Sequence, residues 1–307
     1  MIAGHTISCR NIIGNPIAVN RLDPERTIVI EFPHAADPTG IRHFYDDLAA
    51  TYDLYYADWD ASAGCQARAL QQILKALPSG EHPRRLLDCA CGIGTQLLGL
   101  AALGEHIIGT DFSPAAVHRA HHEAHRRKLR PPLAVADMRA LPFADHSFDG
   151  LVCADNSLPH LTTPVDLAHG LGEMARVLRA EGMLLISVRD YDTARRQRPN
   201  STPPSVRDTP AGRVITFQVW HWYDDGERYN LEHFQLLPTG PNTWQIHRRN
   251  AIYWAVTRAQ LDQALHAAGF YRVQWHESDE TGFFQPIVTA RLAGGAIQSL
   301  HPGPSRP

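Results

Sequence analysis

Between residues 85 and 189, short apolar runs alternate with longer amphipathic stretches. The short runs are rich in Val, Ile and Leu, which is typical of strands buried on both faces of a sheet. We predict such strands near residues 85–89, 106–109, 133–136, 148–153 and 182–189. The stretches between them carry apolar residues at three- and four-residue spacing, which predicts helices near 96–103, 114–128 and 164–178. Alternation of strand and helix favours an α/β fold with a doubly wound, mostly parallel sheet.

A different pattern follows residue 190. We interpret residues 190–210, which are rich in Arg, Pro and Ser, as a loop. Three runs with strand-like alternation come next and are separated by the turn sequences Asp-Asp-Gly-Glu and Pro-Thr-Gly-Pro. They lie at residues 213–223, 228–237 and 243–250. We interpret them as an antiparallel meander inserted into the parallel domain, forming a lid at about residues 190–255. A helix at 258–268 and strands at 270–276 and 283–292 then complete a seven-stranded sheet.

Two helical segments precede the first strand of the sheet. Residues 41–59 carry Phe and Tyr at three- and four-residue steps, and a second helix at 65–77 ends at Pro78-Ser79-Gly80. We expect residues 41–80 to form an aromatic cap on a domain that spans 41–292. Residues 1–40 are interpreted as an extra strand, an arm that packs on a neighbouring subunit of a homo-oligomer, or a tail. Residues 293–307 are rich in Gly and Pro and are predicted to be a disordered tail.

The composition changes the picture mainly by what it excludes. A net charge of −3 gives no general attraction to nucleic acid or to an anionic membrane. No run approaches the ~20 apolar residues of a membrane span, and the N-terminus has no signal-peptide pattern. Five cysteines, an odd number, are typical of a reducing compartment. We therefore expect a cytoplasmic protein that acts on a small molecule and binds neither nucleic acid nor membrane.

Histidine pairs on the predicted helix 114–128 raise the question of a metal site. His118 and His122 are four residues apart, as are His121 and His125, and such pairs bind zinc in other proteins. No cysteine or acidic residue stands at a spacing that would supply a third ligand. We expect no metal.

The most informative residues lie where the first predicted strand ends. Residues 86–94 read Leu-Leu-Asp-Cys-Ala-Cys-Gly-Ile-Gly, and Asp111 follows Gly94 by 17 residues, after the second strand. Glycines in such a turn let the backbone approach a ligand closely, and an acid after the next strand can accept hydrogen bonds from both hydroxyls of a ribose. The pattern predicts a nucleotide site at this edge of the sheet.

Two residues narrow the choice of nucleotide. Leu97 stands where the dinucleotide fingerprint has its third glycine, which argues against an NAD-dependent oxidoreductase. Asp88 stands just before the turn, where it would repel a pyrophosphate but would suit a cationic amino-acid group. S-adenosylmethionine has a ribose, an ammonium and a sulfonium but no phosphate, and it fits better.

Residues 86–94 resemble the first motif of the class I S-adenosylmethionine-dependent methyltransferases. Residues 156–161 (Asn-Ser-Leu-Pro-His-Leu) and 189–192 (Arg-Asp-Tyr-Asp) resemble the Asn-Ser-x-x-His-Leu and Arg-Asn-Tyr-Asp segments of the glycine/sarcosine N-methyltransferase group. The resemblance covers about residues 41–292. It implies a Rossmann-like methyltransferase domain that uses S-adenosylmethionine as its cofactor.

The resemblance also implies which residues contact the cofactor. Asp111 would bind the ribose, Phe112 would lie against the adenine, and the aromatic segment would cover the cofactor. The expected contacts are Tyr45, Tyr52, Asp88, Ala90, Gly92, Gly94, Asp111, Phe112, Asp137 and Met138. For Asp137, a turn-forming role in Ala-Asp-Met-Arg is the alternative. Arg68 is a candidate for the cofactor's carboxylate.

On the acceptor side, Arg189 matches the position of the group's carboxylate-binding arginine, and Asn156 would add a hydrogen bond to the same carboxylate. His160 and Tyr191 would shape the site. An ordinary histidine pKa of about 6.5 would suit a general base, but we favour a positioning role for His160. Asp190 stands where the group has Asn, which would add a negative charge beside the carboxylate site. The alternative for Arg189 is a surface arginine paired with a neighbouring aspartate.

These residues predict N-methylation of a small amine or amino acid, similar to glycine or sarcosine, by in-line displacement. The alternative is O- or C-methylation of a larger metabolite under the lid. A module that binds S-adenosylmethionine without catalysis is disfavoured by the full set of acceptor-side residues. The larger acceptor would contact the lid's aromatic side chains, which are Trp220, Trp222, Tyr223, Tyr253 and Trp254.

Overall fold

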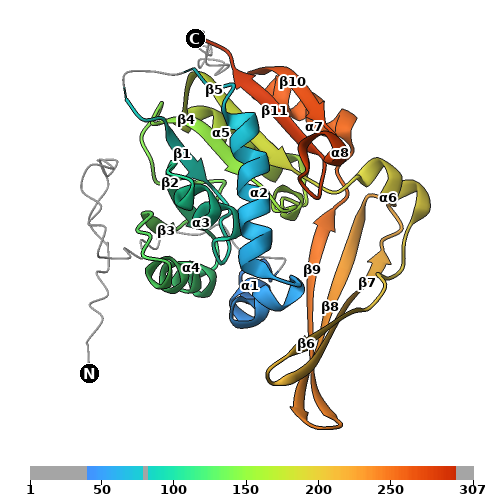
Figure 1. Ribbon diagram of the computed structural model, residues 1–307. Helices are drawn as coiled ribbons and strands as arrows, with labels where there is room; N and C mark the ends of the chain where they lie inside the picture. The colour runs from blue at the N-terminus through green and yellow to red at the C-terminus, as the bar shows by residue number, and fades with distance from the viewer. Residues whose placement is uncertain (1–39, 79–81, 295–307) are drawn as a thin grey trace, which may run out of the picture.

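The structure is a computed structural model that describes residues 40–78 and 82–294. The expectations for the N-terminal arm at 1–39 and for the tail at 295–307 lie outside these residues. The described chain forms two sheets (Figure 1). The larger sheet has seven strands in the order β10-β11-β5-β4-β1-β2-β3. Its strands are β1 (Arg85–Asp88), β2 (His106–Asp111), β3 (Leu133–Val135), β4 (Phe148–Cys153), β5 (Leu178–Ser187), β10 (Phe270–His276) and β11 (Ile287–Leu292).

The first five of these strands pair in parallel, and β11 lies antiparallel between β5 and β10. The helices between them are α3 (Thr95–Ala102), α4 (Pro114–Arg126), α5 (Pro164–Val177), α7 (Arg258–Ala267) and α8 (Ser278–Thr281). Because β1 pairs with β2 on one side and β4 on the other, the strand order reverses at β1. The carboxyl ends of the strands beside such a switch point are where ligands bind. The predicted doubly wound, mostly parallel seven-stranded sheet is confirmed.

Alternate residues of the central strands pack into two buried hydrophobic clusters, one on each face of the sheet. Leu87 packs on the side of α5 and α7, whereas Leu86 packs on the side of α3 and of α2 (Trp59–Leu74). Because both faces are covered, the buried middle of each strand is apolar, as at residues 86–87 of β1 and 150–153 of β4.

The cap before β1 consists of α1 (Ile41–Leu48), a 3₁₀ segment η2 (Ala49–Tyr55) and α2. The single helix predicted over 41–59 is therefore wrong in its second half, where the chain tightens into η2. The second helix begins at Trp59, six residues before the predicted start, because Asp58 caps it by accepting a hydrogen bond from the Ala61 N–H at 2.9 Å.

The lid is a four-stranded antiparallel sheet in the order β6-β7-β8-β9. It comprises β6 (Ser205–Thr209), β7 (Gly212–Trp222), β8 (Arg228–Gly240) and β9 (Thr243–Trp254), and α6 (Tyr191–Gln197) leads into it. The inserted antiparallel lid is confirmed, but the loop predicted at 190–210 is wrong, because α6 and β6 lie there. The strand predicted from residue 283 also begins later, at Ile287, directly after Pro286.

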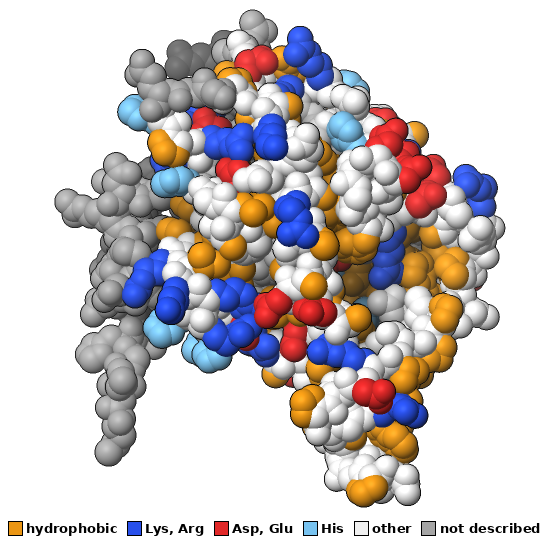
Figure 2. Space-filling model, viewed as in Figure 1, with side chains coloured by type: hydrophobic (Ala, Val, Ile, Leu, Met, Phe, Trp, Pro, Cys, Tyr) orange, Lys and Arg blue, Asp and Glu red, His pale blue; other side chains and the backbone are white. Residues whose placement is uncertain are grey.

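The lid projects from the body of the molecule, and hydrophobic side chains line it (Figures 1 and 2). Val206, Trp244 and Ile246 are exposed on it. Its inner part is fastened to the cap, because Thr51 of η2 donates a hydrogen bond to the side chain of Gln235 of β8 at 2.8 Å. Within residues 40–78 and 82–294, no helix combines the length and the apolar character needed to cross a bilayer.

Candidate active site

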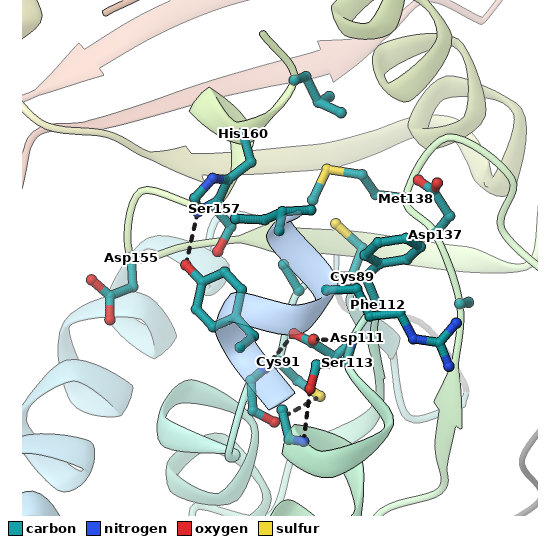
Figure 3. A pocket seen from close by; sticks show the side chains of 18 of the residues that line it. Cys89, Cys91, Asp111, Phe112, Ser113, Asp137, Met138, Asp155, Ser157 and His160 are labelled. Carbon is teal, nitrogen blue, oxygen red and sulfur yellow. Dashed lines mark hydrogen bonds between the residues drawn. The ribbon is translucent and has the colours of Figure 1, made fainter. Parts of the chain in front are cut away.

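A pocket lies at the carboxyl ends of β1, β2, β3 and β4, under the cap (Figure 3). It holds about 1210 Å³ of empty space, its open mouth included. Its walls include these predicted cofactor residues: Tyr45, Tyr52, Ala90, Gly92, Asp111, Phe112, Asp137 and Met138. Asp88 and Gly94 are not part of the wall: Asp88 is the buried last residue of β1, and Gly94 ends the turn and precedes α3. The structure thus brings these residues together, and their cofactor contacts stay predictions.

The turn after β1 is held by Asp111. One carboxylate oxygen of Asp111 accepts the Gly92 N–H at 2.7 Å, and the other accepts the Ser113 N–H at 2.9 Å. Gly92 and Gly94 have φ angles of 54° and 99°, a region that side chains rarely adopt. Burial raises the pKa of Asp111 to about 6, although the two N–H groups act against this shift. The carboxylate is therefore fixed in orientation at the pocket wall.

Asp88 lies directly behind this turn with unmet hydrogen-bonding capacity. Its side chain is buried, one oxygen accepts the Ala90 N–H at 3.3 Å, and the other oxygen has no partner. Burial raises the pKa of Asp88 to about 8. A buried carboxyl group of this kind favours a positively charged or hydrogen-donating neighbour.

Asp137 serves an ion pair as well as the pocket wall. The guanidinium of Arg139 approaches the Asp137 carboxylate to 2.7 Å and also binds Asp166 at 2.7 Å. The Arg139 N–H donates to Asp137 at 2.8 Å, which is the turn-forming contact expected as the alternative. Asp137 and Met138 lie on the side of the pocket opposite Asp155 (Figure 3).

The expectation for Arg68 is wrong. Arg68 is exposed on α2, donates to the sulfur of Cys65 at 3.2 Å, and is not part of the pocket wall. Arg42 of α1 lines the pocket instead, with its guanidinium 6.0 Å from the ring centre of Phe112. The positions of Arg42 and Arg68 relative to the aromatic segment in the sequence did not show which of the two side chains points into the pocket.

A second pocket lies between the cap and the lid. It holds about 1220 Å³ of empty space, its mouth included, and its walls include Asn156, Arg189 and Tyr253. Tyr45, Tyr52 and Asp155 line both pockets, so the two cavities adjoin at these side chains.

Arg189 brings a positive charge to the second pocket. Its Nη2 donates to the Gln218 side chain at 3.2 Å, and its guanidinium lies 4.8 Å from the ring centre of Trp220. Its Nη1 is buried without a hydrogen-bond partner of normal geometry, although the Tyr229 hydroxyl is near. Among the described residues no carboxylate forms a salt bridge with Arg189, so the alternative of an arginine paired with a neighbouring aspartate is wrong. Asp155 of the same pocket attracts this guanidinium without forming a salt bridge, and the unmet Nη1 donor favours an anionic ligand.

Asn156 lies beside Arg189, and its side-chain N–H donors have no acceptor of normal geometry. Its side-chain oxygen accepts the Arg189 backbone N–H at 3.1 Å, and its Nδ2 is buried without a partner of normal geometry. Two unmet donors in one wall are complementary to a carboxylate.

The two residues after Arg189 do not reach the pockets. Asp190 is exposed and caps α6 by accepting the Thr193 N–H at 3.0 Å, so the expected negative charge beside the carboxylate site is wrong. Tyr191 is buried and shares a hydrogen bond with the Tyr229 hydroxyl at 2.9 Å, behind the wall. Tyr191 therefore supports the site from outside.

His160 lies on the wall of the first pocket with both ring nitrogens engaged. Its Nε2 is 2.8 Å from the Tyr45 hydroxyl, and its Nδ1 is 3.4 Å from the carbonyl of Ile252 (Figure 3). A carbonyl only accepts, so Nδ1 carries the proton and Nε2 accepts from Tyr45. This arrangement fits the positioning role expected for His160.

The aromatic lid residues split between the pocket and the core. Tyr253 lines the second pocket, whereas Trp220 stacks on Tyr229 with ring centres 4.5 Å apart and Trp222 donates to the carbonyl of Pro199 at 3.0 Å. Neither tryptophan is part of either wall. The expectation that they form an acceptor surface is wrong, because they pack inside the lid.

Sequence reasoning missed Asp155 and His233. Asp155 directly precedes Asn156 at the end of β4, and this polar position at a strand end was the available signal. His233 is buried on β8, where its Nδ1 is 3.1 Å from the Tyr55 hydroxyl and its Nε2 has no partner. A polar residue on the inward face of a lid strand was its signal. In the described parts of the chain, no three His, Cys, Asp or Glu side chains gather as a metal would require.

Comparison with known proteins agrees with this geometry. Residues 86–182 match the family model described as "Methyltransferase domain". A glycine/sarcosine N-methyltransferase of Parasynechococcus marenigrum (strain WH8102) is 33% identical over 153 residues, which cover 49% of this chain and 52% of that protein. A demethylmenaquinone methyltransferase of Beutenbergia cavernae is 36% identical over 154 residues, covering 49% and 58%. The matches thus span little more than half of these relatives.

One solved structure extends the likeness over most of the fold. CalS10 of Micromonospora echinaspora, described as an amino pentose methyltransferase and solved with S-adenosylmethionine bound, superposes with a TM-score of 0.61 at 21% identity. The superposition covers 79% of this chain and 94% of that chain. Residues 86–182 thus match a methyltransferase domain, and the chain shares its fold with solved S-adenosylmethionine-dependent methyltransferases.

Proposed function

We propose that this chain transfers a methyl group from S-adenosylmethionine to the nitrogen of a small amine that carries a carboxylate, such as glycine or sarcosine. The observation that carries the proposal is the pair of adjoining pockets. One has a fixed acid at a glycine turn, and the other is lined by Arg189, whose Nη1 has no hydrogen-bond partner. Methyl transfer needs two ligands held with their reacting atoms about 3 Å apart, and adjoining pockets allow that arrangement.

The first pocket fits the cofactor in two respects. Asp111 presents an oriented carboxylate to a ribose. A Cβ built on Gly92 would meet no atom within 4 Å, so the turn leaves space for a ligand. When bound, S-adenosylmethionine supplies an electrophilic methyl group on sulfur, whose C–S bond breaks with its electron pair kept by the sulfur.

The chain's own residues hold the acceptor in the second pocket. Arg189 and Asn156 donate to its carboxylate, and the Tyr45–His160 hydrogen bond fixes a wall between the two cavities. Catalysis on this scheme comes from orientation and needs no covalent enzyme intermediate.

The alternative acceptor is a larger metabolite methylated on oxygen or carbon. The extent of the second pocket's lining, which comes from the cap, the sheet and the lid, favours it, since glycine would contact only a part of this lining. Two of the similar proteins named above, the demethylmenaquinone methyltransferase and the amino pentose methyltransferase, have names that state acceptors larger than glycine. The absence of Trp220 and Trp222 from the described walls weakens it.

Glycine and sarcosine should be far better acceptors than their amides. Loss of the carboxylate removes a charge-assisted pairing with Arg189, which corresponds to about a 30- to 1000-fold lower kcat/KM. The measurement is the initial rate of S-adenosylhomocysteine release with each acid and its amide. Equal rates for acid and amide would show that the carboxylate is not recognised.

Alanine at Gly94 should mainly lower stability, whereas alanine at Gly92 should mainly lower cofactor affinity. At Gly94 a Cβ would lie 2.8 Å from Leu98, so we expect a loss of about 2–4 kcal/mol in the free energy of unfolding. At Gly92 the Cβ projects into open pocket space, so we expect a loss of about 1–2 kcal/mol but a larger fall in affinity for S-adenosylhomocysteine. Denaturant unfolding and titration calorimetry measure both quantities, and the reverse pattern would contradict the assignment of the turn.

A further inference from the structure

Asp155 is the carboxylate shared by the two pockets. It lines both cavities, and it lies across the first pocket from Asp137 and Met138 (Figure 3). Tyr45 and Tyr52 are the other side chains found in both walls. An acceptor that reaches from the second pocket toward the first must pass this junction.

The surroundings of Asp155 leave one of its oxygens for a ligand. The hydroxyls of Tyr52 and Tyr56 donate to the same oxygen, Oδ2, at 3.2 Å and 3.0 Å. Among the described residues no donor binds the other oxygen, Oδ1. The two tyrosines therefore fix the carboxylate plane while Oδ1 stays available.

The second pocket has a positive charge on its wall and a negative charge at its junction with the first pocket. Arg189 lines this pocket with a buried, unpaired Nη1, and Asp155 lies at the junction with the first pocket. A molecule with a carboxylate at one end and an ammonium at the other would lie with its carboxylate at Arg189. Its nitrogen would then lie at Asp155, next to the first pocket.

We infer that Asp155 is a catalytic residue that binds the acceptor's nitrogen at this junction and removes a proton from it. In this step an N–H bond of the ammonium breaks, the proton passes to a carboxylate oxygen of Asp155, and the electron pair stays on nitrogen as the lone pair that attacks. The proton leaves for solvent after turnover. The inference rests on the proposed function, because it requires an amine acceptor.

Other groups at the junction are less suited to this step. Burial raises the pKa values of Tyr45, Tyr52 and Tyr56 above the ordinary tyrosine value, so their hydroxyls stay protonated and donate. His160 uses Nε2 to accept from Tyr45. Burial raises the pKa of Asp155 to about 6, against the lowering effects of Tyr56, Tyr52 and Arg189. Asp155 is thus ionised at neutral pH and closer in pKa to an amine than an exposed aspartate would be.

The backbone at Asp155 permits a clean test. Asp155 and Asn156 have φ angles of 55° and 63°, a conformation that Asp and Asn tolerate better than most residues. The side chain of Ser187 contacts the Asp155 N–H at 2.8 Å. Asp155→Asn therefore keeps the shape and the backbone while it removes the charge.

The experiment compares wild type, Asp155→Asn and the control Asp208→Asn, whose carboxylate is exposed on the lid. Wild type is first supplied with S-adenosylmethionine and glycine or sarcosine, and N-methyl product is measured by mass spectrometry. The methylation rates of all three proteins are then measured from pH 5 to pH 9, and calorimetry gives their affinity for S-adenosylhomocysteine. Tyr56→Phe is a second variant that leaves the carboxylate in place.

We expect Asp155→Asn to lower kcat more than 100-fold with cofactor-product affinity unchanged within threefold. We expect kcat/KM of wild type and of Asp208→Asn to fall below about pH 6, where Asp155 becomes protonated, and Tyr56→Phe to move this fall to higher pH. An Asp155→Asn variant as active as wild type, or a Tyr56→Phe profile identical to wild type, would overturn the inference. Failure of wild type to methylate any amino acid would instead overturn the proposed function, and the inference with it.

Discussion

Replacing Arg189 with methionine is expected to lower kcat/KM for the amino-acid acceptor by about 100- to 1000-fold, almost entirely through KM. The reason is the loss of the guanidinium that faces the acceptor's carboxylate. Affinity for S-adenosylhomocysteine should stay within threefold, because Arg189 is not part of the first pocket's wall. Steady-state kinetics and calorimetry measure the two effects separately.

The same variant should not lose stability. Arg189 has no salt-bridge partner among the described residues, so its removal breaks no ion pair and costs only the hydrogen bond from its Nη2 to the Gln218 side chain. Methionine keeps an apolar contact with Trp220, which offsets the lost cation–π attraction of about 1 kcal/mol. We expect a Tm close to that of wild type. A clear fall in Tm together with unchanged KM would show that Arg189 is structural.

Replacing Asp111 with alanine is expected to lower the affinity for S-adenosylmethionine by at least about 100-fold and to abolish activity. Each hydrogen bond from a ribose hydroxyl to the carboxylate is worth about 1.5–3 kcal/mol, and the Gly92 N–H also loses its acceptor. Titration calorimetry with S-adenosylhomocysteine measures the loss without the need for an acceptor.

The control for this prediction is Asp145→Ala, which removes an exposed carboxylate that pairs with Arg176. The control should bind S-adenosylhomocysteine as wild type does, and its stability should change by no more than about 1 kcal/mol. If Asp111→Ala bound with wild-type affinity, the ribose would have to lie elsewhere, and the assignment of the first pocket would be wrong.

The parallel core could be predicted because its physics is local and strong. Strands such as β4, buried on both faces, carry several consecutive apolar residues, here 150–153, and such runs are visible in the sequence. The segment 190–210 gave no such signal, because β6 is mostly exposed and exists through pairing with β7. Its strand character is a tertiary effect that local composition does not carry.

The candidate site divides in the same way. Gly92 lies in the turn after β1 and Asp111 lies at the end of β2, so their spacing in the sequence was enough to predict that both lie at this edge of the sheet. The second pocket depends on contacts between distant segments, such as Tyr55 of η2 with His233 of β8. Nothing in the sequence near His233 shows that η2 will pack on it. The inward turn of Arg42 rather than Arg68 likewise follows from how the cap packs on the sheet.

The measurement that tests the central claim most directly uses S-adenosylmethionine with a deuterated methyl group. The protein is incubated with it and with a pooled metabolite extract containing glycine, sarcosine and the common amino acids, and labelled products are identified by mass spectrometry. The account predicts a labelled N-methyl amino acid whose rate of formation at low acceptor concentration falls about 100-fold or more in Arg189→Met. Label found only on oxygen or carbon of a molecule without a carboxylate would contradict it.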